Sequence, residues 1–267
     1  IFRTKNIITM VKEFENKKKW ALIIGGSSGL GLATAKKLAK HGMNICIVHR
    51  NSRSQLDQIK RDFKEIKKES VKFISYNTDA FKTEKREDLI EYLKEELDGG
   101  KIKILVHSVA KGNLKPMVSD TSPILQTDDF QLTIQAMGIS LYDWVKAIFE
   151  AKLFADDGRV VSFTSEGNSK ALKNYAAVSA AKVTLEAITR NIALEFARFG
   201  IRANCIQAGV SDTASFQMIP GNNKLKKHSL ERNPFDRLTL PEDVANVVYL
   251  LSNCLLYTSP SPRDEQS

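Results

Sequence analysis

Six short apolar runs alternate with longer segments of helical periodicity, and this alternation constrains the fold more than any other feature. The predicted strands cover residues 20–24, 44–48, 71–75, 102–107, 159–164 and 201–206. The predicted helices cover residues 30–41, 54–68, 85–97, 128–151, 173–199 and a last segment after Pro241. Continuous β-branched runs joined by helices are typical of parallel strands that are buried on both faces. The sequence therefore predicts an α/β fold, a doubly wound parallel sheet with helices on both faces.

The same pattern sets the expected domain boundaries. Residues 18–253 contain all of it without a Pro/Gly-rich linker or a repeat, so we expect one domain there. Residues 1–17 are predicted to be an N-terminal extension, partly foreign to the native protein, because Met10 is the first methionine. Residues 254–267 continue no helical or strand pattern, and we expect a disordered tail that is truncated or foreign.

Composition narrows the classes of partner. The 267 residues carry a net charge of +9, but the lysines are scattered among acids and lack interleaved aromatic residues. Nucleic acid is therefore not expected, while solvated helix faces and an acidic partner both stay open. The longest apolar stretch, residues 244–257, is too short and too interrupted to predict a membrane span. Three cysteines without metal-ligand spacing predict no metal site and a cytoplasmic location.

A glycine-rich turn directly follows the first predicted strand and opens the first predicted helix. Glycines allow a tight turn and let backbone amides approach a pyrophosphate at the helix N-terminus. The spacing differs from the commoner Gly-x-Gly-x-x-Gly pattern, but the strand–turn–helix context favours dinucleotide binding. The candidate cofactor contacts in this turn are Gly25, Ser27, Ser28, Gly29, Leu30 and Gly31.

The end of the second predicted strand is expected to select between NADH and NADPH. NAD sites usually carry an acid here to hold the ribose hydroxyls, whereas this chain has Arg50 and Arg53 and no acid. An arginine fork suits a 2′-phosphate, so we assign Arg50 to the cofactor and prefer NADPH, with NADH still possible. The other interpretation is that both arginines begin a solvated helix.

Tyr175 and Lys182 form the candidate catalytic pair. Seven positions are two helical turns, so both side chains are expected on one face. An ammonium close to a phenol favours the phenolate and lowers the pKa of the tyrosine, which gives a tuned acid. The pair alone also fits an ordinary amphipathic helix, and the upstream glycine-rich turn is what favours catalysis.

Together these motifs resemble the short-chain dehydrogenase/reductase family over roughly residues 18–253. The resemblance implies a single-domain Rossmann-like fold. The Tyr-x6-Lys spacing, in place of the family's usual Tyr-x3-Lys, is similar to the enoyl-acyl-carrier-protein reductase branch. The segments Val106-His107-Ser108-Val109-Ala110 and Leu185-Glu186-Ala187 are also similar to that branch. Residues 111–118 most resemble its NADPH-dependent type.

The resemblance implies roles for the matched residues. Tyr175 would bond the enolate oxygen, Lys182 would hold the nicotinamide ribose, and Ser165 would either assist Tyr175 or simply end the fifth strand. Asp79 would touch adenine or cap a strand end, and residues 215–232 would form a mobile lid or an ordinary surface excursion. The implied cofactor contacts beyond the glycine-rich turn are Asp79, Ala80, Ser108, Val109, Ala110, Lys182, Gly209, Val210 and Thr213.

The shifted tyrosine also has a chemical interpretation. In an enoyl thioester the hydride goes to C3 while the negative charge collects on the C1 oxygen, two carbons away. Moving a tyrosine three places along a helix displaces it by about 4.5 Å on roughly the same face. The expected function is NADPH-dependent reduction of an enoyl-acyl-carrier-protein thioester in fatty acid elongation. The alternatives are a carbonyl reductase of 3-oxoacyl thioesters, ketones or sugars, and a nucleotide sensor without turnover.

Three departures from the family pattern qualify these expectations. Residues 130–141 lack the helix asparagine of ketone-reducing relatives, and Gln135 and Ser140 are the nearest polar candidates. Ala208 stands where a proline usually precedes Gly209. The family's last strand and its Asp-Gly-Gly turn are not present, which puts the family's usual homotetramer in doubt.

Overall fold

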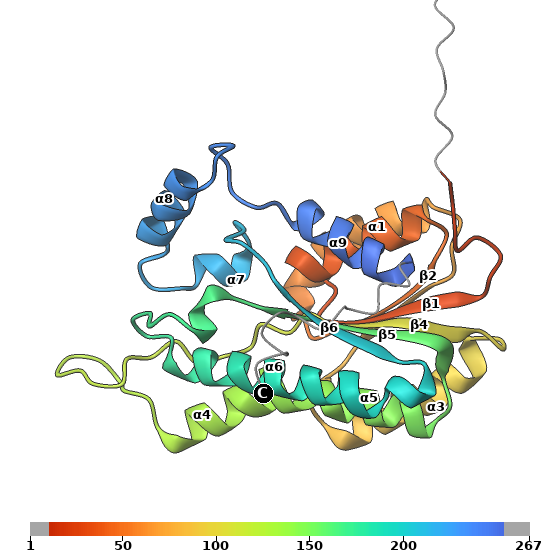
Figure 1. Ribbon diagram of the computed structural model, residues 1–267, viewed down its shortest axis with the longest axis horizontal. Helices are drawn as coiled ribbons and strands as arrows, with labels where there is room; N and C mark the ends of the chain where they lie inside the picture. The colour runs from red at the N-terminus through yellow and green to blue at the C-terminus, as the bar shows by residue number, and fades with distance from the viewer. Residues whose placement is uncertain (1–10, 254–267) are drawn as a thin grey trace, which may run out of the picture.

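The computed structural model describes residues 11–253, which form three layers with a parallel sheet in the middle (Figure 1). The strands are β1 (Lys19–Ile24), β2 (Asn44–His49), β3 (Phe73–Asn77), β4 (Lys101–His107), β5 (Phe154–Thr164) and β6 (Arg202–Gln207). They pair in the order β3-β2-β1-β4-β5-β6, and every pair is parallel. The predicted doubly wound α/β fold is therefore confirmed.

Helices cover both faces of the sheet because both faces of its central strands are apolar. The helices α1 (Gly29–Lys40), α2 (Leu56–Lys67) and α9 (Pro241–Asn253) bury one core against the first face. The second face packs against α3 (Thr83–Glu96), α5 (Ser140–Glu150) and α6 (Ala176–Glu195), which carry Trp144 in their shared core. Figure 1 shows α1 and α9 on one side of the strands and α5 and α6 on the other.

Several element boundaries differ from the sequence-based expectation. The helix expected over residues 128–151 is divided into α4 (Thr127–Ile134), a π-helical turn (Gln135–Ile139) and α5. The helix expected from residue 173 begins at Ala176, because Asn174 adopts a left-handed conformation (φ 61°) that no helix can continue.

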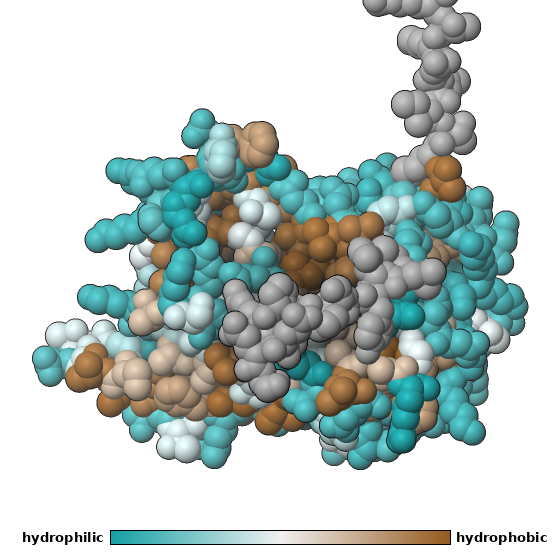
Figure 2. Space-filling view, viewed as in Figure 1, coloured by the Kyte–Doolittle hydropathy of each residue, from teal (hydrophilic) through white to brown (hydrophobic). Residues whose placement is uncertain are grey.

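Residues 215–232 are also more regular than the predicted apolar excursion. They contain α7 (Ala214–Gln217) and α8 (Asn222–Arg232). All residues of α8 are at least partly exposed, and its outer face is hydrophilic (Figure 2). The segment expected to be a mobile lid or an ordinary surface excursion thus consists of two short helices joined by a turn.

The described part of the predicted N-terminal extension packs against the domain. Phe14 is 5% exposed and belongs to the same core as Met43. Its backbone N–H donates to the carbonyl oxygen of His41 at 3.0 Å, and the His41 ring lies 2.8 Å from the Glu13 carboxylate. Phe14 therefore anchors residues 11–17 to the core of the domain. The expectations for residues 1–10 and for the tail at 254–267 fall outside the described residues.

Two further findings concern the described chain between residues 11 and 253. None of its helices is long and apolar enough to cross a membrane. Its sheet has six strands, with β3 and β6 at the two edges.

Candidate active site

The glycine-rich turn after β1 lies in backbone contact with the end of β4. Gly25 has a positive φ of 87°, and a Cβ there would lie 2.3 Å from the Ser108 carbonyl oxygen. A Cβ on Gly31 would lie 2.4 Å from the Gly25 carbonyl oxygen. Gly29 (φ 53°) faces the methyl group of Thr213, which follows β6. Three segments that the sequence predicted separately therefore converge at the carboxyl ends of the strands.

The residues present at this turn fit a dinucleotide. Ser28 is the N-cap of α1, and within residues 11–253 its side chain makes no capping hydrogen bond. The first amides of α1 therefore donate no hydrogen bond to the Ser28 side chain. Such an N-terminus, with close glycine backbone on one side, is suited to a pyrophosphate.

Arg50 and Asp79 pair with each other at the ends of β2 and β3. Arg50 Nη1 lies 2.8 Å from Asp79 Oδ2, and the guanidinium is 56% exposed. Asp79 Oδ1 also accepts the backbone N–H of Phe81 at 3.1 Å, which is the capping arrangement. Burial acts to raise the pKa of Asp79, but the Phe81 amide and the nearby cations outweigh it and hold that pKa below its usual value. Next to it, Ala80 is buried and its carbonyl oxygen accepts the Trp144 indole N–H at 3.2 Å.

The predicted cofactor contacts after β6 are tied to the segment that leads into α9. A Cβ on Gly209 would lie 2.3 Å from the Thr239 hydroxyl, and the Val210 carbonyl oxygen accepts the Thr239 N–H at 3.2 Å. Thr213 is the N-cap of α7, where its hydroxyl accepts the Phe216 N–H at 3.3 Å. Thr213 therefore caps a helix and also lies next to the glycine-rich turn.

Tyr175 and Ser165 meet where β5 ends and α6 begins. Ser165 directly follows β5, and its Oγ lies 3.2 Å from Tyr175 Oη. Tyr175 is 8% exposed and occupies the N-cap of α6, one residue before the helix. Gly167 packs on the tyrosine ring so closely that a Cβ there would lie 2.4 Å from it. The predicted phenol and the predicted serine are thus neighbours in the described structure.

Lys182 lies on α6 below this pair and is also buried. Its ammonium donates to the Phe163 carbonyl oxygen on β5 at 2.6 Å. Burial lowers the pKa of Lys182 from 10.5 to about 8, an effect that Cys205 and Glu186 partly offset. The structure corrects the expectation that Lys182 lowers the pKa of Tyr175: burial raises that pKa, and the Ser165 hydrogen bond offsets it only in part.

Two polar contacts around this pair were not among the sequence-based predictions. His107, the last residue of β4, is buried, and its Nε2 lies 2.8 Å from Ser140 Oγ. Because Ser140 donates to the Ala136 carbonyl oxygen at 2.7 Å, it accepts its other hydrogen bond from His107. Burial lowers the pKa of His107 to about 3, so the ring is neutral. Ser140, the candidate for the missing helix asparagine, is thus engaged with β4.

The second missed contact joins Glu186 of α6 to the turn after β5. The Glu186 carboxylate accepts hydrogen bonds from the Thr164 hydroxyl and from the Asn168 side-chain amide. The signals in the sequence were the resemblance of Leu185-Glu186-Ala187 to the enoyl reductase branch and the position of Glu186, four residues after Lys182 and therefore on the same helical face.

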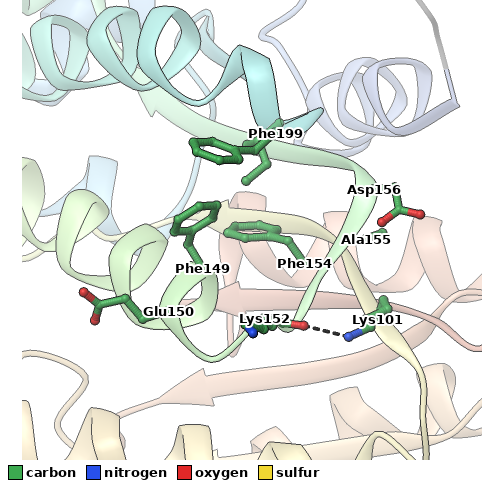
Figure 3. A pocket seen from close by; sticks show the side chains of 9 residues that line it. Lys101, Phe149, Glu150, Lys152, Phe154, Ala155, Asp156 and Phe199 are labelled. Atoms are coloured by element: carbon green, nitrogen blue, oxygen red, sulfur yellow. Dashed lines mark hydrogen bonds between the residues drawn. The ribbon is translucent and has the colours of Figure 1, made fainter.

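A hollow of about 510 Å³ lies at the opposite ends of the strands (Figure 3). Phe149, Phe154 and Phe199 cluster in its wall, and beside them Lys101 Nζ donates to the Lys152 carbonyl oxygen at 2.6 Å. Lys101 and Phe154 are the first residues of β4 and β5, so the hollow opens at the amino ends of the strands. Because ligands of open parallel sheets bind at the carboxyl ends, we do not assign this hollow to the reaction.

Comparison with known proteins places the chain among related reductases and dehydrogenases. The family model described as enoyl-(acyl carrier protein) reductase matches residues 25–258. The enoyl-acyl-carrier-protein reductase (NADH) FabI of Rickettsia bellii is 30% identical over 235 residues, 86% of this chain and 84% of that protein. The 7alpha-hydroxysteroid dehydrogenase of Paraclostridium sordellii is also 30% identical, over 244 residues, 89% of this chain and 85% of that protein.

A solved structure shows the same fold. The enoyl-acyl-carrier-protein reductase (NADH) of Aquifex aeolicus VF5 matches with a TM-score of 0.76 and 24% identity, over 90% of each chain. The curated relatives differ in substrate while sharing most of their length with this chain. What they and the family model establish in common is that the chain belongs to the short-chain dehydrogenase/reductase family of NAD(P)-dependent oxidoreductases.

Proposed function

We propose that the protein reduces the C2=C3 double bond of an enoyl-acyl-carrier-protein thioester with NADPH. The observation that carries this proposal is the geometry at the start of α6. Tyr175 stands seven residues before Lys182, and its buried hydroxyl lies 3.2 Å from Ser165 Oγ. A phenol three residues further from the lysine than in the family's usual Tyr-x3-Lys spacing suits a substrate whose charge develops two carbons from the hydride acceptor. The description of the matching family model supports the same chemistry.

The side chains divide the work between proton and charge. Bound NADPH would supply the hydride. Tyr175 would donate its hydroxyl to the developing enolate oxygen, and its raised pKa keeps it protonated at neutral pH. Lys182, whose pKa is about 8, would be mostly charged at pH 7 and would stabilise negative charge nearby. Ser165 would orient the phenol through their hydrogen bond.

NADPH is preferred because of the charge at the end of β2. Arg50 is 56% exposed there and could turn toward a 2′-phosphate, at the cost of its ion pair with Asp79. An exposed ion pair contributes at most about 1 kcal/mol, less than a charge-assisted contact to a phosphate provides. The two enoyl-acyl-carrier-protein reductases compared above are named as NADH enzymes, so our preference for NADPH rests on Arg50 of this chain alone.

An acidic carrier protein would find positive charge on α8. This helix carries Lys224, Lys226 and Lys227, and its outer face is hydrophilic (Figure 2). Lys226 pairs with Asp212 at 2.5 Å, while Lys227 is 80% exposed and lies 3.9 Å from the Glu231 carboxylate. The helix belongs to residues 215–232, so a carrier bound there would contact the segment expected to be a lid.

A second candidate function is reduction of a carbonyl, either a 3-oxoacyl thioester or an alcohol-forming ketone. The contact of 3.2 Å between Ser165 and Tyr175 favours it, because a serine beside the acid can help to bind a carbonyl oxygen. The steroid dehydrogenase relative supports the same reading.

Parallel assays separate the two functions. NADPH oxidation at 340 nm is followed with crotonyl and acetoacetyl thioesters under the same conditions. We expect turnover of the crotonyl thioester. Turnover of the acetoacetyl thioester alone would reject the enoyl proposal, and binding of NADPH without turnover of any substrate would favour a nucleotide sensor.

The role of Tyr175 is tested by Tyr175→Phe. Loss of the hydroxyl removes the donor to the enolate oxygen, so kcat should fall by about 100-fold while NADPH affinity stays the same. Tyr142→Phe is the matched control, because Tyr142 is 44% exposed on α5. A fully active Tyr175→Phe protein would show that another group supplies the proton.

The role of Arg50 is tested by Arg50→Asp, with Arg53→Asp as the control for the charge change. An acid at position 50 repels a 2′-phosphate and can bind ribose hydroxyls, so the ratio of kcat/KM for NADPH to that for NADH should fall by about tenfold or more. The ratio should stay near its wild-type value in the control. An unchanged ratio for Arg50→Asp would remove Arg50 from cofactor selection.

A further inference from the structure

Glu186 lies on α6 one helical turn beyond Lys182 and faces the turn that follows β5. One of its carboxylate oxygens accepts both the Thr164 hydroxyl and the Asn168 side-chain N–H. Thr164 is the last residue of β5, and Asn168 is the last residue of the 3-10 turn Glu166–Asn168. Both ends of the segment that carries Ser165 are therefore bound to a single carboxylate.

The position of this segment decides the distance between Ser165 and Tyr175. Ser165 Oγ lies 3.2 Å from Tyr175 Oη, and Gly167 of the same turn packs against the tyrosine ring. A small displacement of the turn would lengthen the first contact or press the backbone at Gly167 onto the ring. The carboxylate on α6 therefore fixes the serine relative to a tyrosine at the start of that same helix.

Glu186 also contributes charge to the site. Burial lowers the pKa of Lys182, whereas Cys205 on β6 and the Glu186 carboxylate on the same helix act to raise it. His107 on β4 is neutral and feels the charge of Lys182. A carboxylate at position 186 thus acts in two ways, as a hydrogen-bond acceptor for the turn and as a countercharge.

We infer that Glu186 is a positioning residue for the reaction, whose carboxylate holds the Ser165 turn in place beside Tyr175. The inference rests on the proposed reductase function, because positioning matters only if Ser165 and Tyr175 act on a substrate. Two substitutions separate the two actions of the carboxylate. Glu186→Gln keeps an oxygen that can accept both hydrogen bonds but removes the charge, whereas Glu186→Ala removes both. Glu195→Ala, an exposed acid on the same helix, is the control.

The test measures kcat, KM for NADPH and the pH profile of all three variants, together with hydrogen exchange of the turn amides. The Asn168 and Ser169 N–H groups donate to Ser165 and Glu166 carbonyl oxygens at 3.2 Å, so their exchange reports the turn directly. We expect Glu186→Ala to lose about tenfold or more in kcat, to change KM for NADPH little, and to speed exchange of these amides. Glu186→Gln should keep kcat within about threefold of wild type, and exchange of the turn amides should stay slow. The basic limb of its pH profile should move to lower pH.

Three results would overturn the inference. One is a Glu186→Ala protein with wild-type kcat and wild-type exchange in the turn. Another is a Glu186→Gln protein as impaired as Glu186→Ala, since charge rather than turn position would then matter. The third is faster exchange in Glu195→Ala as well, which would indicate general loosening of α6. If the wild-type protein reduces only the ketone, the enoyl proposal fails and the same comparison is made with that substrate. If it reduces neither thioester, the enoyl and carbonyl proposals both fail, and the exchange data alone decide whether the Glu186 carboxylate holds the Ser165 turn.

Discussion

Lys182→Met should stabilise the protein relative to wild type, and this stabilisation should be larger at neutral pH than at alkaline pH. Lys182 is buried, and its pKa falls from 10.5 to about 8 on folding because burial disfavours the ammonium. At pH 7 the folded protein still holds this proton, so a buried positive charge is present. The cost of burying that charge lowers the free energy of unfolding. A methionine of similar length carries no such charge.

The size of the effect follows from the two pKa values. One pKa unit is about 1.4 kcal/mol, so a fall from 10.5 to about 8 corresponds to a penalty of about 3 kcal/mol at pH 7. Between pH 8 and 10.5 the unfolded chain binds more protons than the folded one, so the contribution of this group to stability rises with pH. By about pH 9.5, about 2 kcal/mol of the penalty should be gone.

The assay is urea unfolding of wild type and Lys182→Met at pH 7 and at about pH 9.5. Methionine also removes the N–H donor to the Phe163 carbonyl oxygen. Both an ammonium and a neutral amine can donate this hydrogen bond, so its loss is present at both pH values. We expect the advantage of Lys182→Met over wild type to shrink by about 2 kcal/mol on going to the higher pH. Lys146→Met, an exposed lysine on α5, should show no such pH dependence. A stability difference that is equal at both pH values would refute the reasoning.

Two further predictions concern the fold around the site. Gly25→Ala should lower the free energy of unfolding by about 1–3 kcal/mol more than Gly99→Ala. Both positions have positive φ, but only a Cβ at position 25 meets backbone, the Ser108 carbonyl. Equal losses in urea unfolding would show that the turn can adjust to the added Cβ. Phe14→Ala should cost about 3 kcal/mol, since Phe14 is 5% exposed in the core, whereas Phe235→Ala, at 82% exposure, should cost little; a thermal melt unaffected by Phe14→Ala would mean that residues 11–17 add nothing to the core.

The strands could be predicted from the sequence because their burial is a local property. In the middle of β1, Leu22 and Ile23 are fully buried on opposite faces, so an unbroken apolar run was sufficient to identify a two-sided strand. The glycine-rich turn could be predicted for a similar reason, since Gly25 needs a positive φ that other residues rarely adopt. The start of α6 could not, because Asn174 takes a left-handed conformation that its sequence context does not demand.

Contacts between distant side chains were harder to predict than elements. The spacing of Lys182 and Glu186 is that of an ordinary ion pair on a helix surface. Nothing in that spacing shows that the carboxylate would instead bind Thr164 and Asn168, which are 22 and 18 residues away. Such contacts depend on how β5 and α6 pack, and a single sequence contains no direct record of that packing.

The corrected pKa of Tyr175 favours its proposed role more than the original expectation did. A phenol that Lys182 had made strongly acidic would tend to have lost its proton before an enolate formed. Here the Lys182 ammonium is bound to the Phe163 carbonyl oxygen on β5, and burial keeps Tyr175 neutral. A neutral phenol still holds the proton that a developing oxyanion needs, and the positive charge of Lys182 then stabilises the negative charge on that oxyanion. The donor and the countercharge are therefore separate groups, and only the lysine should titrate close to neutral pH.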